Sequence, residues 1–156
     1  MGHINTTLVY IRDLENKKTL MLHRVKKNGD IHKGKWNGVG GKFEDGESPN
    51  ECAIREVFEE TGLKVSNGRL CGILTFPKFN NGVDGLAFVY EFNEFCGDLI
   101  ECNEGNLEWI DDDKVLDLNL WDGDYIFLPW VFESKFFSGK FIYENKKLVE
   151  HFVEFH

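Results

Sequence analysis

Three glutamates stand close together in the segment Arg55-Glu56-Val57-Phe58-Glu59-Glu60, at relative positions i, i+3 and i+4. On an α-helix this spacing places the three carboxylates within an arc of roughly 100°. Like charges so close repel one another, so a positive group must compensate them. Arg55 can neutralise one carboxylate, and the remaining charge suits a hard divalent cation, Mg²⁺ or its substitute Mn²⁺. A solvated acidic helix face is the alternative, and the cluster alone does not decide between the two.

A helix that would carry these glutamates is well marked at both ends. Ser48 is a suitable N-cap, Pro49 suits the first helical position, and Glu51 can bond back to the cap. Gly62 is a natural stop. We expect an apolar stripe on the helix face opposite the glutamates, formed by Ala53, Ile54, Val57 and Phe58.

The remaining elements are predicted from composition and turn signals. Runs rich in β-branched and apolar residues predict strands at 6–11, 19–25, 65–74, 85–92 and 107–110, the first two forming a hairpin. The glycine-rich segment 26–46 is predicted to be a loop. A second helix is predicted over 124–137, bent by Pro129, and a terminal hairpin over 141–143 and 147–155. The expected fold class is α/β, with one domain over residues 1–156.

Composition restricts the kinds of partner. The chain has 156 residues and a formal net charge of −9, which disfavours stable binding to nucleic acid and leaves a small anionic ligand possible through a cation. Cys52, Cys71, Cys96 and Cys102 show no paired spacing and are expected to be reduced thiols. No stretch suits a membrane span or signal peptide, so the expected location is the cytoplasm. The oligomeric state is left open.

The wider pattern around the glutamates resembles a known family. From Gly41 to Leu63 the sequence matches each fixed position of the Nudix box, G-x5-E-x7-R-E-U-x-E-E-x-G-U, where U is aliphatic. The chain therefore resembles a Nudix hydrolase, and the resemblance implies an α/β/α sandwich with a mixed sheet. It also implies Mg²⁺-dependent attack of water on a nucleoside diphosphate linked to another group.

The same resemblance implies roles for individual residues. Metal ligands would be Glu56, Glu59, Glu60 and the backbone carbonyl of Gly40. Glu104, on a loop before Trp109, resembles an additional glutamate that acts as a ligand or base in relatives, and the general base is left open between Glu59 and Glu104. The motif residues expected to be structural are Gly41, Glu47, Arg55 and Gly62, with an ion pair between Glu47 and Arg55.

Segments outside the box resemble the MutT-type 8-oxo-dGTP diphosphatases, which sanitise the nucleotide pool and so protect DNA. By this likeness Asn37 and Asp124 would bind the edge of a purine, Trp121 would stack on its face, and Lys26 would lie near the nucleotide. Each has a plainer alternative: a turn residue for Asn37, a helix cap for Asp124, a core residue for Trp121 and a solvated turn for Lys26. Gly123 departs from the paired aspartates of the vertebrate enzyme.

The expected activity is conversion of a purine nucleoside triphosphate, 8-oxo-dGTP first, to the monophosphate and pyrophosphate. One alternative is an ADP-ribose or ADP-sugar pyrophosphatase, to which Pro77 points weakly, and the other is a non-catalytic nucleotide sensor. The five histidines show no metal-ligand spacing and are interpreted as surface or incidental residues. Phe76 and Phe79 are assigned to core packing, although they could flank the base.

Overall fold

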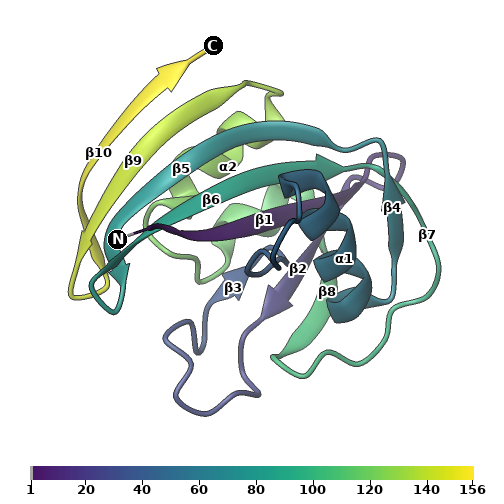
Figure 1. Cartoon of the computed structure of the whole chain (residues 1–156). Coiled ribbons are helices and arrows are strands. Elements are labelled where there is room, and N and C mark those ends of the chain that lie inside the picture. Colours follow the sequence, from purple (N-terminus) through teal and green to yellow (C-terminus); the bar gives the residue numbers. More distant parts are fainter. Residues whose placement is uncertain (1) are drawn as a thin grey trace.

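A curved, mixed β-sheet forms the centre of the computed structural model, which describes residues 2–156 (Figure 1). The strand order is β10-β9-β5-β6-β1-β2-β3, and β8 pairs with β2. Neighbouring strands are antiparallel except that β1 runs parallel to β6, and β5 parallel to β9. The strands are β1 Ile4–Asp13, β2 Lys18–His23, β3 Trp36–Asn37, β5 Arg69–Asn80, β6 Val83–Phe92, β8 Asn106–Asp111, β9 Phe137–Glu144 and β10 Lys147–Phe155, and a separate pair is formed by β4 Lys64–Ser66 and β7 Glu94–Cys96.

The predicted first hairpin is present, but its strands separate soon after the turn. β1 and β2 pair only through Arg12 with Thr19 and Asp13 with Lys18. The rest of β1 pairs with β6 instead. On its other side β1 meets the glycine-rich loop, where Val9 and Val39 exchange backbone hydrogen bonds of 2.6 and 3.0 Å. The separation of β1 from β2 thus lets this loop run along the middle of the sheet.

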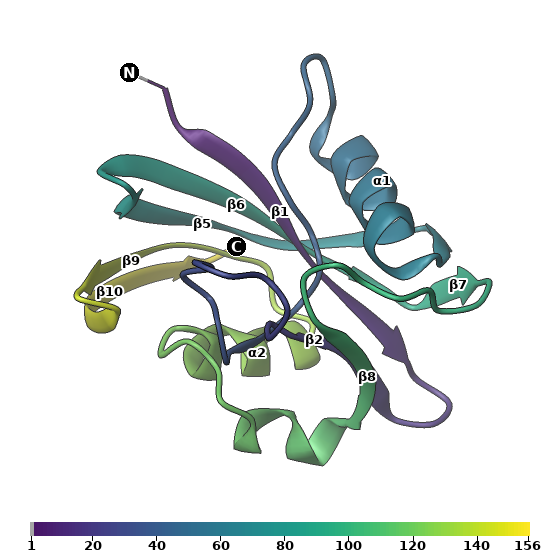
Figure 2. The same ribbon diagram turned by 90° about the horizontal axis from the view of Figure 1, so that it is seen from below.

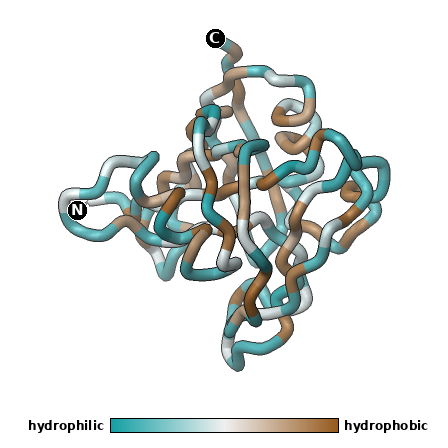
Figure 3. Tube along the Cα trace, turned by 90° about the vertical axis from the view of Figure 1, so that its right-hand side faces the viewer, coloured by the Kyte–Doolittle hydropathy of each residue, from teal (hydrophilic) through white to brown (hydrophobic). Residues whose placement is uncertain are grey.

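Two helices cover opposite faces of the sheet (Figure 2). Along β1, Val9 and Ile11 belong to the hydrophobic core under helix α1 (Pro49–Thr61), whereas Tyr10 belongs to the core under helix α2 (Asp124–Phe132). Alternate residues of a strand point to opposite faces, which explains this division. The two cores confirm the expected α/β/α sandwich. In Figure 3 the hydrophobic colouring is concentrated inside the molecule, and many outer turns are hydrophilic.

Helix α1 begins and ends as its sequence predicts. Ser48 accepts from the backbone N–H of Glu51, the Glu51 side chain accepts in return, and Gly62 ends the helix with φ of 82°. The expected apolar stripe was wrong in part, because Ile54 is 36% exposed and Phe58 is 50% exposed. The buried residues of the helix are Cys52, Ala53, Val57 and Thr61.

Helix α2 is shorter than predicted. It ends at Phe132 because Ser134 adopts a left-handed conformation with φ of 58°, and Phe137 then begins β9. A 3₁₀ helix, η1 (Asp112–Asp117), lies between β8 and α2. The terminal hairpin β9–β10 is present as expected, with an intervening turn at Asn145.

Two expectations from composition can be compared directly with the structure. All four cysteines are free thiols. Within residues 2–156, no helix has the length and apolar character needed to cross a membrane.

Candidate active site

Two adjacent glycines bring the loop after β3 against helix α1. Gly40 has φ of 145°, and a Cβ added there would lie 2.1 Å from the carbonyl oxygen of Thr7. A Cβ on Gly41 would lie 2.6 Å from the carboxylate carbon of Glu56. The backbone N–H of Gly40 donates to Glu60 Oε2 at 2.8 Å. Only residues without a side chain allow the backbone to approach both β1 and the glutamates so closely.

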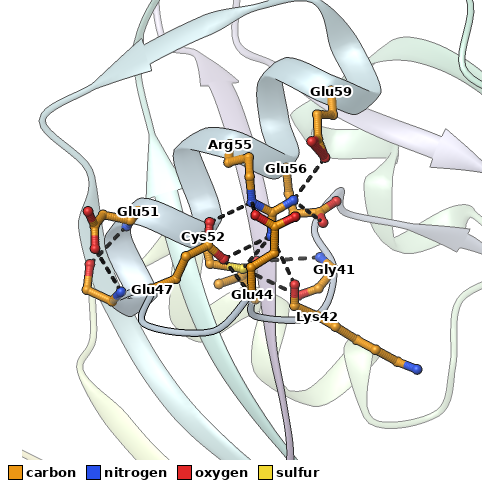
Figure 4. A network of polar contacts seen from close by, with 11 residues as sticks. Gly41, Lys42, Glu44, Glu47, Glu51, Cys52, Arg55, Glu56 and Glu59 are labelled. Carbon is orange, nitrogen blue, oxygen red and sulfur yellow. Dashed lines mark hydrogen bonds and ion pairs between the residues drawn. The ribbon is translucent and has the colours of Figure 1, made fainter.

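Arg55 braces the loop and helix that carry the glutamates (Figure 4). Its Nη2 donates to Glu47 Oε1 at 2.9 Å and to the carbonyl oxygen of Lys42 at 3.0 Å. Its Nη1 donates to Glu56 Oε1 at 2.8 Å and to Glu59 Oε2 at 2.9 Å. Hydrogen bonding from Arg55 lowers the pKa of Glu47 to about 2. The ion pair expected from the sequence is therefore present.

Glu56, Glu60 and Glu104 form what we call the acidic cluster. One ligand atom each from Glu60, Glu104 and Cys102 lies within 4.8 Å of the other two. Burial raises the pKa of Glu60 well above its usual range, and the nearby Glu104 carboxylate raises it further. Burial also raises the pKa of Glu56. Glu59 differs from these residues, because its side chain is 54% exposed.

The donor set of the acidic cluster fits a hard divalent cation. Carboxylate oxygens converge there, and within residues 2–156 no basic side chain forms a salt bridge with Glu60. A bound cation would compensate both the burial that disfavours ionisation of these carboxyl groups and their mutual repulsion. The expected ligands Glu56, Glu60, Glu104 and Gly40 lie together. Glu59 is more exposed and, like Glu56, accepts from Arg55 Nη1.

A cavity of about 620 Å³ runs from the acidic cluster to a region of polar and aromatic side chains. We call the part of the cavity around Asn37, Trp121 and Asp124 the base end. Asn37 and Asp124 line the base end and are 9% and 8% exposed. Burial raises the pKa of Asp124 to about 8. Asp124 does not cap α2, because Gly123 occupies the cap position. Burial thus favours the uncharged carboxylic acid form of Asp124, which faces the cavity.

Trp121 also lines the cavity, but it is only 5% exposed. Its ring lies 5.2 Å from that of Phe79 and 5.6 Å from that of Tyr143, both in edge contacts. The sequence left open whether Trp121 is a stacking platform or a core residue, and its position is compatible with both roles. The Trp121–Asp124 segment is in turn anchored by the terminal hairpin, because Gly123 N–H donates to the Tyr143 hydroxyl at 2.7 Å.

Sequence reasoning missed several cavity residues. His32 lines the cavity and accepts a hydrogen bond of 2.8 Å from the Trp121 indole, so the interpretation of every histidine as surface or incidental was wrong. Burial, with the charge of Arg24, lowers the pKa of His32 to about 4. Phe76 and Phe79 line the cavity as well. No local spacing could reveal His32, because its partner lies 89 positions away.

Arg24 is one of the basic residues that line the cavity, with Lys42 and Arg55. The Nη2 of Arg24 lies 3.2 Å from Glu104 Oε1. Lys26, the residue chosen from the sequence, is not among the cavity-lining residues. Its Nζ donates instead to the carbonyl oxygen of Cys102 at 3.1 Å and pairs with Glu101 at 3.3 Å. Lys26 thus ties down the loop that presents Glu104.

Comparison with known proteins agrees with this geometry. The family model for the NUDIX domain matches residues 2–131. The chain is 31% identical over 128 residues to the oxidized purine nucleoside triphosphate hydrolase of Danio rerio, covering 81% of each chain. It is 27% identical over 146 residues to the protein of the same name from Mus musculus, covering 94% of this chain and 93% of the relative.

Among solved structures, the MutT protein from Bacillus halodurans superposes with a TM-score of 0.84 and 30% identity, covering 97% of each chain. The matched family model includes the glycine-rich loop, the capped helix and the glutamates described above. Nudix hydrolases typically use a divalent metal and act on small nucleotide-like substrates. The chain belongs to the Nudix hydrolase family and is a MutT-like pyrophosphohydrolase.

Proposed function

We propose that this enzyme hydrolyses a purine nucleoside triphosphate, with 8-oxo-dGTP as the first candidate, to the monophosphate and pyrophosphate. The observation that carries the proposal is the cavity that joins the acidic cluster to Asn37, Trp121 and Asp124. The names of the zebrafish and mouse relatives support the same substrate class. Such an activity would remove an oxidised nucleotide from the pool used for DNA synthesis.

The acidic cluster is proposed to hold Mg²⁺, with Mn²⁺ as a substitute. Its ligands would be the carboxylates of Glu56 and Glu60 and the carbonyl oxygen of Gly40, and Glu104 would be a further ligand if it does not serve as the base. A bound divalent cation neutralises charge on phosphate oxygens and makes a coordinated water more acidic. The protein contributes a rigid arrangement of ligands, because Arg55 fixes Glu56 and the Gly40 N–H fixes Glu60.

Hydrolysis requires a water oxygen to bond to a phosphorus of the α–β linkage while the bridging P–O bond breaks and a base takes the proton of the water. We assign this proton transfer to Glu104. Its carboxylate lines the cavity, whereas Glu59 is outside the cavity lining and its side chain is more exposed. Glu59 stays the alternative base and a predicted ligand.

The base end suits the edge and face of a purine. The Asn37 amide offers one acceptor and two donors, and the neutral form of Asp124 can donate from its hydroxyl and accept at its other oxygen. The exposed part of Trp121 offers an apolar surface for stacking. Because Asp124 lines the cavity and Asp122 does not, we expect recognition of the base edge to depend on the protonation state of Asp124.

The test is hydrolysis of a nucleotide panel by the purified protein with Mg²⁺. We expect 8-oxo-dGTP and dGTP to be cleaved, with pyrophosphate as the second product. Cleavage of ADP-ribose with release of a sugar phosphate, while both triphosphates stayed intact, would overturn the substrate assignment. Absence of any turnover across the panel would favour the nucleotide sensor.

A variant pair tests the acidic cluster separately. The double substitution Glu56→Gln and Glu60→Gln should abolish turnover and Mn²⁺ binding, because two cation ligands lose their charge. Glu150→Gln, at an exposed position on β10, is the matched control and should retain both. Ordinary turnover by the double variant would show that the ligands were wrongly assigned.

A further inference from the structure

The orientation of Trp121 is fixed by one directional contact. Its indole Nε1 donates to Nδ1 of His32 at 2.8 Å. An indole N–H can only donate, so Nδ1 must be the unprotonated nitrogen of the His32 ring, and the neutral ring carries its proton on Nε2. The hydrogen bond therefore selects both the tautomer of His32 and the rotation of Trp121.

The loop that carries His32 is itself held in place. Asp30 Oδ1 accepts from the backbone N–H of His32 at 3.0 Å, and Asp30 Oδ2 accepts from Arg24 Nε at 2.9 Å. Arg24 also reaches Glu104 at 3.2 Å. A continuous series of polar contacts thus runs from the acidic cluster to Trp121. His32 is the last member of this series before the base end.

The other neighbours of Trp121 pack against the indole without a hydrogen bond to it. Phe79 and Tyr143 approach it edge-on, with interplanar angles of 71° and 87°. The Lys35 ammonium lies 5.5 Å from the ring centroid. Aromatic and cation–π contacts tolerate rotation of the ring more readily than a hydrogen bond does, because they lack one fixed donor direction. The contact with His32 is therefore the directional restraint on Trp121.

We propose that His32 is a positioning residue for base recognition, which holds the Trp121 indole in the orientation that receives a purine. The inference rests on the proposed purine substrate and goes beyond it by naming the group that sets selectivity. Loss of this group should weaken purine binding more than pyrimidine binding, because a large flat base depends more on a correctly oriented platform.

Three variants separate the hydrogen bond from side-chain bulk. His32→Leu removes the acceptor, His32→Asn restores an acceptor oxygen near the position of Nδ1, and Trp121→Phe removes the donor while keeping an aromatic ring. His151→Leu, on the exposed face of β10 and outside the cavity lining, is the matched control. The probes are GMP and CMP, with dissociation constants measured by calorimetry, and circular dichroism verifies folding.

For His32→Leu we expect roughly tenfold weaker GMP binding and a change of less than about twofold for CMP. In dGTP hydrolysis, KM should rise more than kcat falls. His32→Asn should recover most of the loss, and His32→Leu should add little to Trp121→Phe, because the two residues act through one contact. ¹⁵N NMR of the unaltered protein should show an unprotonated Nδ1.

A folded His32→Leu variant that binds GMP as the unaltered protein does would overturn the inference, as would full additivity with Trp121→Phe or a protonated Nδ1. Failure of the proposed function has a different signature. If the protein binds GMP selectively and depends on His32 but does not cleave dGTP, the positioning role stands and the hydrolytic assignment falls. Equal binding of GMP and CMP by the unaltered protein would refute both.

Discussion

The carboxylate of Glu56 occupies the space that a side chain at position 41 would need. A Cβ built on Gly41 lies 2.6 Å from the carboxylate carbon and 2.7 Å from both oxygens of Glu56. The glycine is required by this close approach and not by its backbone conformation, because Gly41 is not among the residues with positive φ. Gly41 and Glu56 thus form what we call a fitted pair, because the carboxylate occupies space that only a glycine leaves free.

Replacement of Gly41 by alanine should displace the Glu56 carboxylate and impair the cation site. We expect kcat/KM to fall by about tenfold or more, because misplacing a ligand by a fraction of an ångström disturbs the reacting geometry. Mn²⁺ affinity should fall in parallel, as measured by calorimetry. Gly2→Ala is the control, since a Cβ there has no neighbour within 4 Å. Unchanged Mn²⁺ binding by Gly41→Ala would contradict the fitted-pair interpretation.

Glu60→Gln should stabilise the metal-free protein while preventing stabilisation by metal. The folded-state pKa of Glu60 is raised by burial, so its contribution to stability is present at low pH and is lost as pH rises from the unfolded value toward the folded one. At pH 8 without metal, the variant should melt about 2–4 °C higher than the unaltered protein, which corresponds to about 1 kcal/mol. Added Mn²⁺ should raise the melting temperature of the unaltered protein only.

Asp124→Asn should change the pH dependence of stability. Burial raises the folded-state pKa of Asp124 to about 8, so charging this group destabilises the fold as pH rises from its unfolded value through about 8. The variant should therefore be more stable than the unaltered protein, and this difference in the free energy of unfolding should increase between pH 5 and pH 8 and then level off. A gain of about 1–3 kcal/mol at pH 8 is expected, by denaturant titration. A difference independent of pH would show that Asp124 does not titrate in this way.

Glu104→Gln and Glu59→Gln distinguish the two candidate bases. Loss of the general base lowers kcat by about 10²–10⁴-fold and removes the acidic limb of the pH–rate profile, and we expect this result for Glu104. Glu59→Gln should cost less, because that side chain is exposed and paired with Arg55. Asp98→Asn, at an exposed position in the segment that leads to Glu104, is the control. The reverse order of effects would assign the base to Glu59.

Helix α1 could be predicted from sequence because its signals are local. Ser48, Pro49, Glu51 and Gly62 each act within a turn of their own position, and the capping box forms as expected. The turn between β5 and β6 also has a local signal in the sequence, since Asn81 and Gly82 both adopt positive φ there.

Which residues of α1 are covered, and by which part of the chain, could not be derived from the helix sequence alone. Glu56 and Glu60 are half-buried, because the glycine-rich loop packs over this part of the helix and supplies a polar partner in the Gly40 N–H. A periodic pattern shows which residues share a face but does not show what covers it. The contact between His32 and Trp121 was hidden for the same reason, since it joins two loops far apart in sequence.

The terminal hairpin lies beyond the matched family region at 2–131, yet it supplies Tyr143 to the cavity wall. The Tyr143 hydroxyl also accepts a hydrogen bond from the segment after Trp121. A second hydrogen bond to this segment runs from the backbone N–H of Leu148 to Asp122 Oδ2, at 2.9 Å. The hairpin therefore restrains the segment that carries Trp121 and Asp124, while the carboxylates of the acidic cluster all come from parts of the chain before it. If the proposed function holds, substitutions at Tyr143 should alter the shape of the base end while leaving the acidic cluster unchanged.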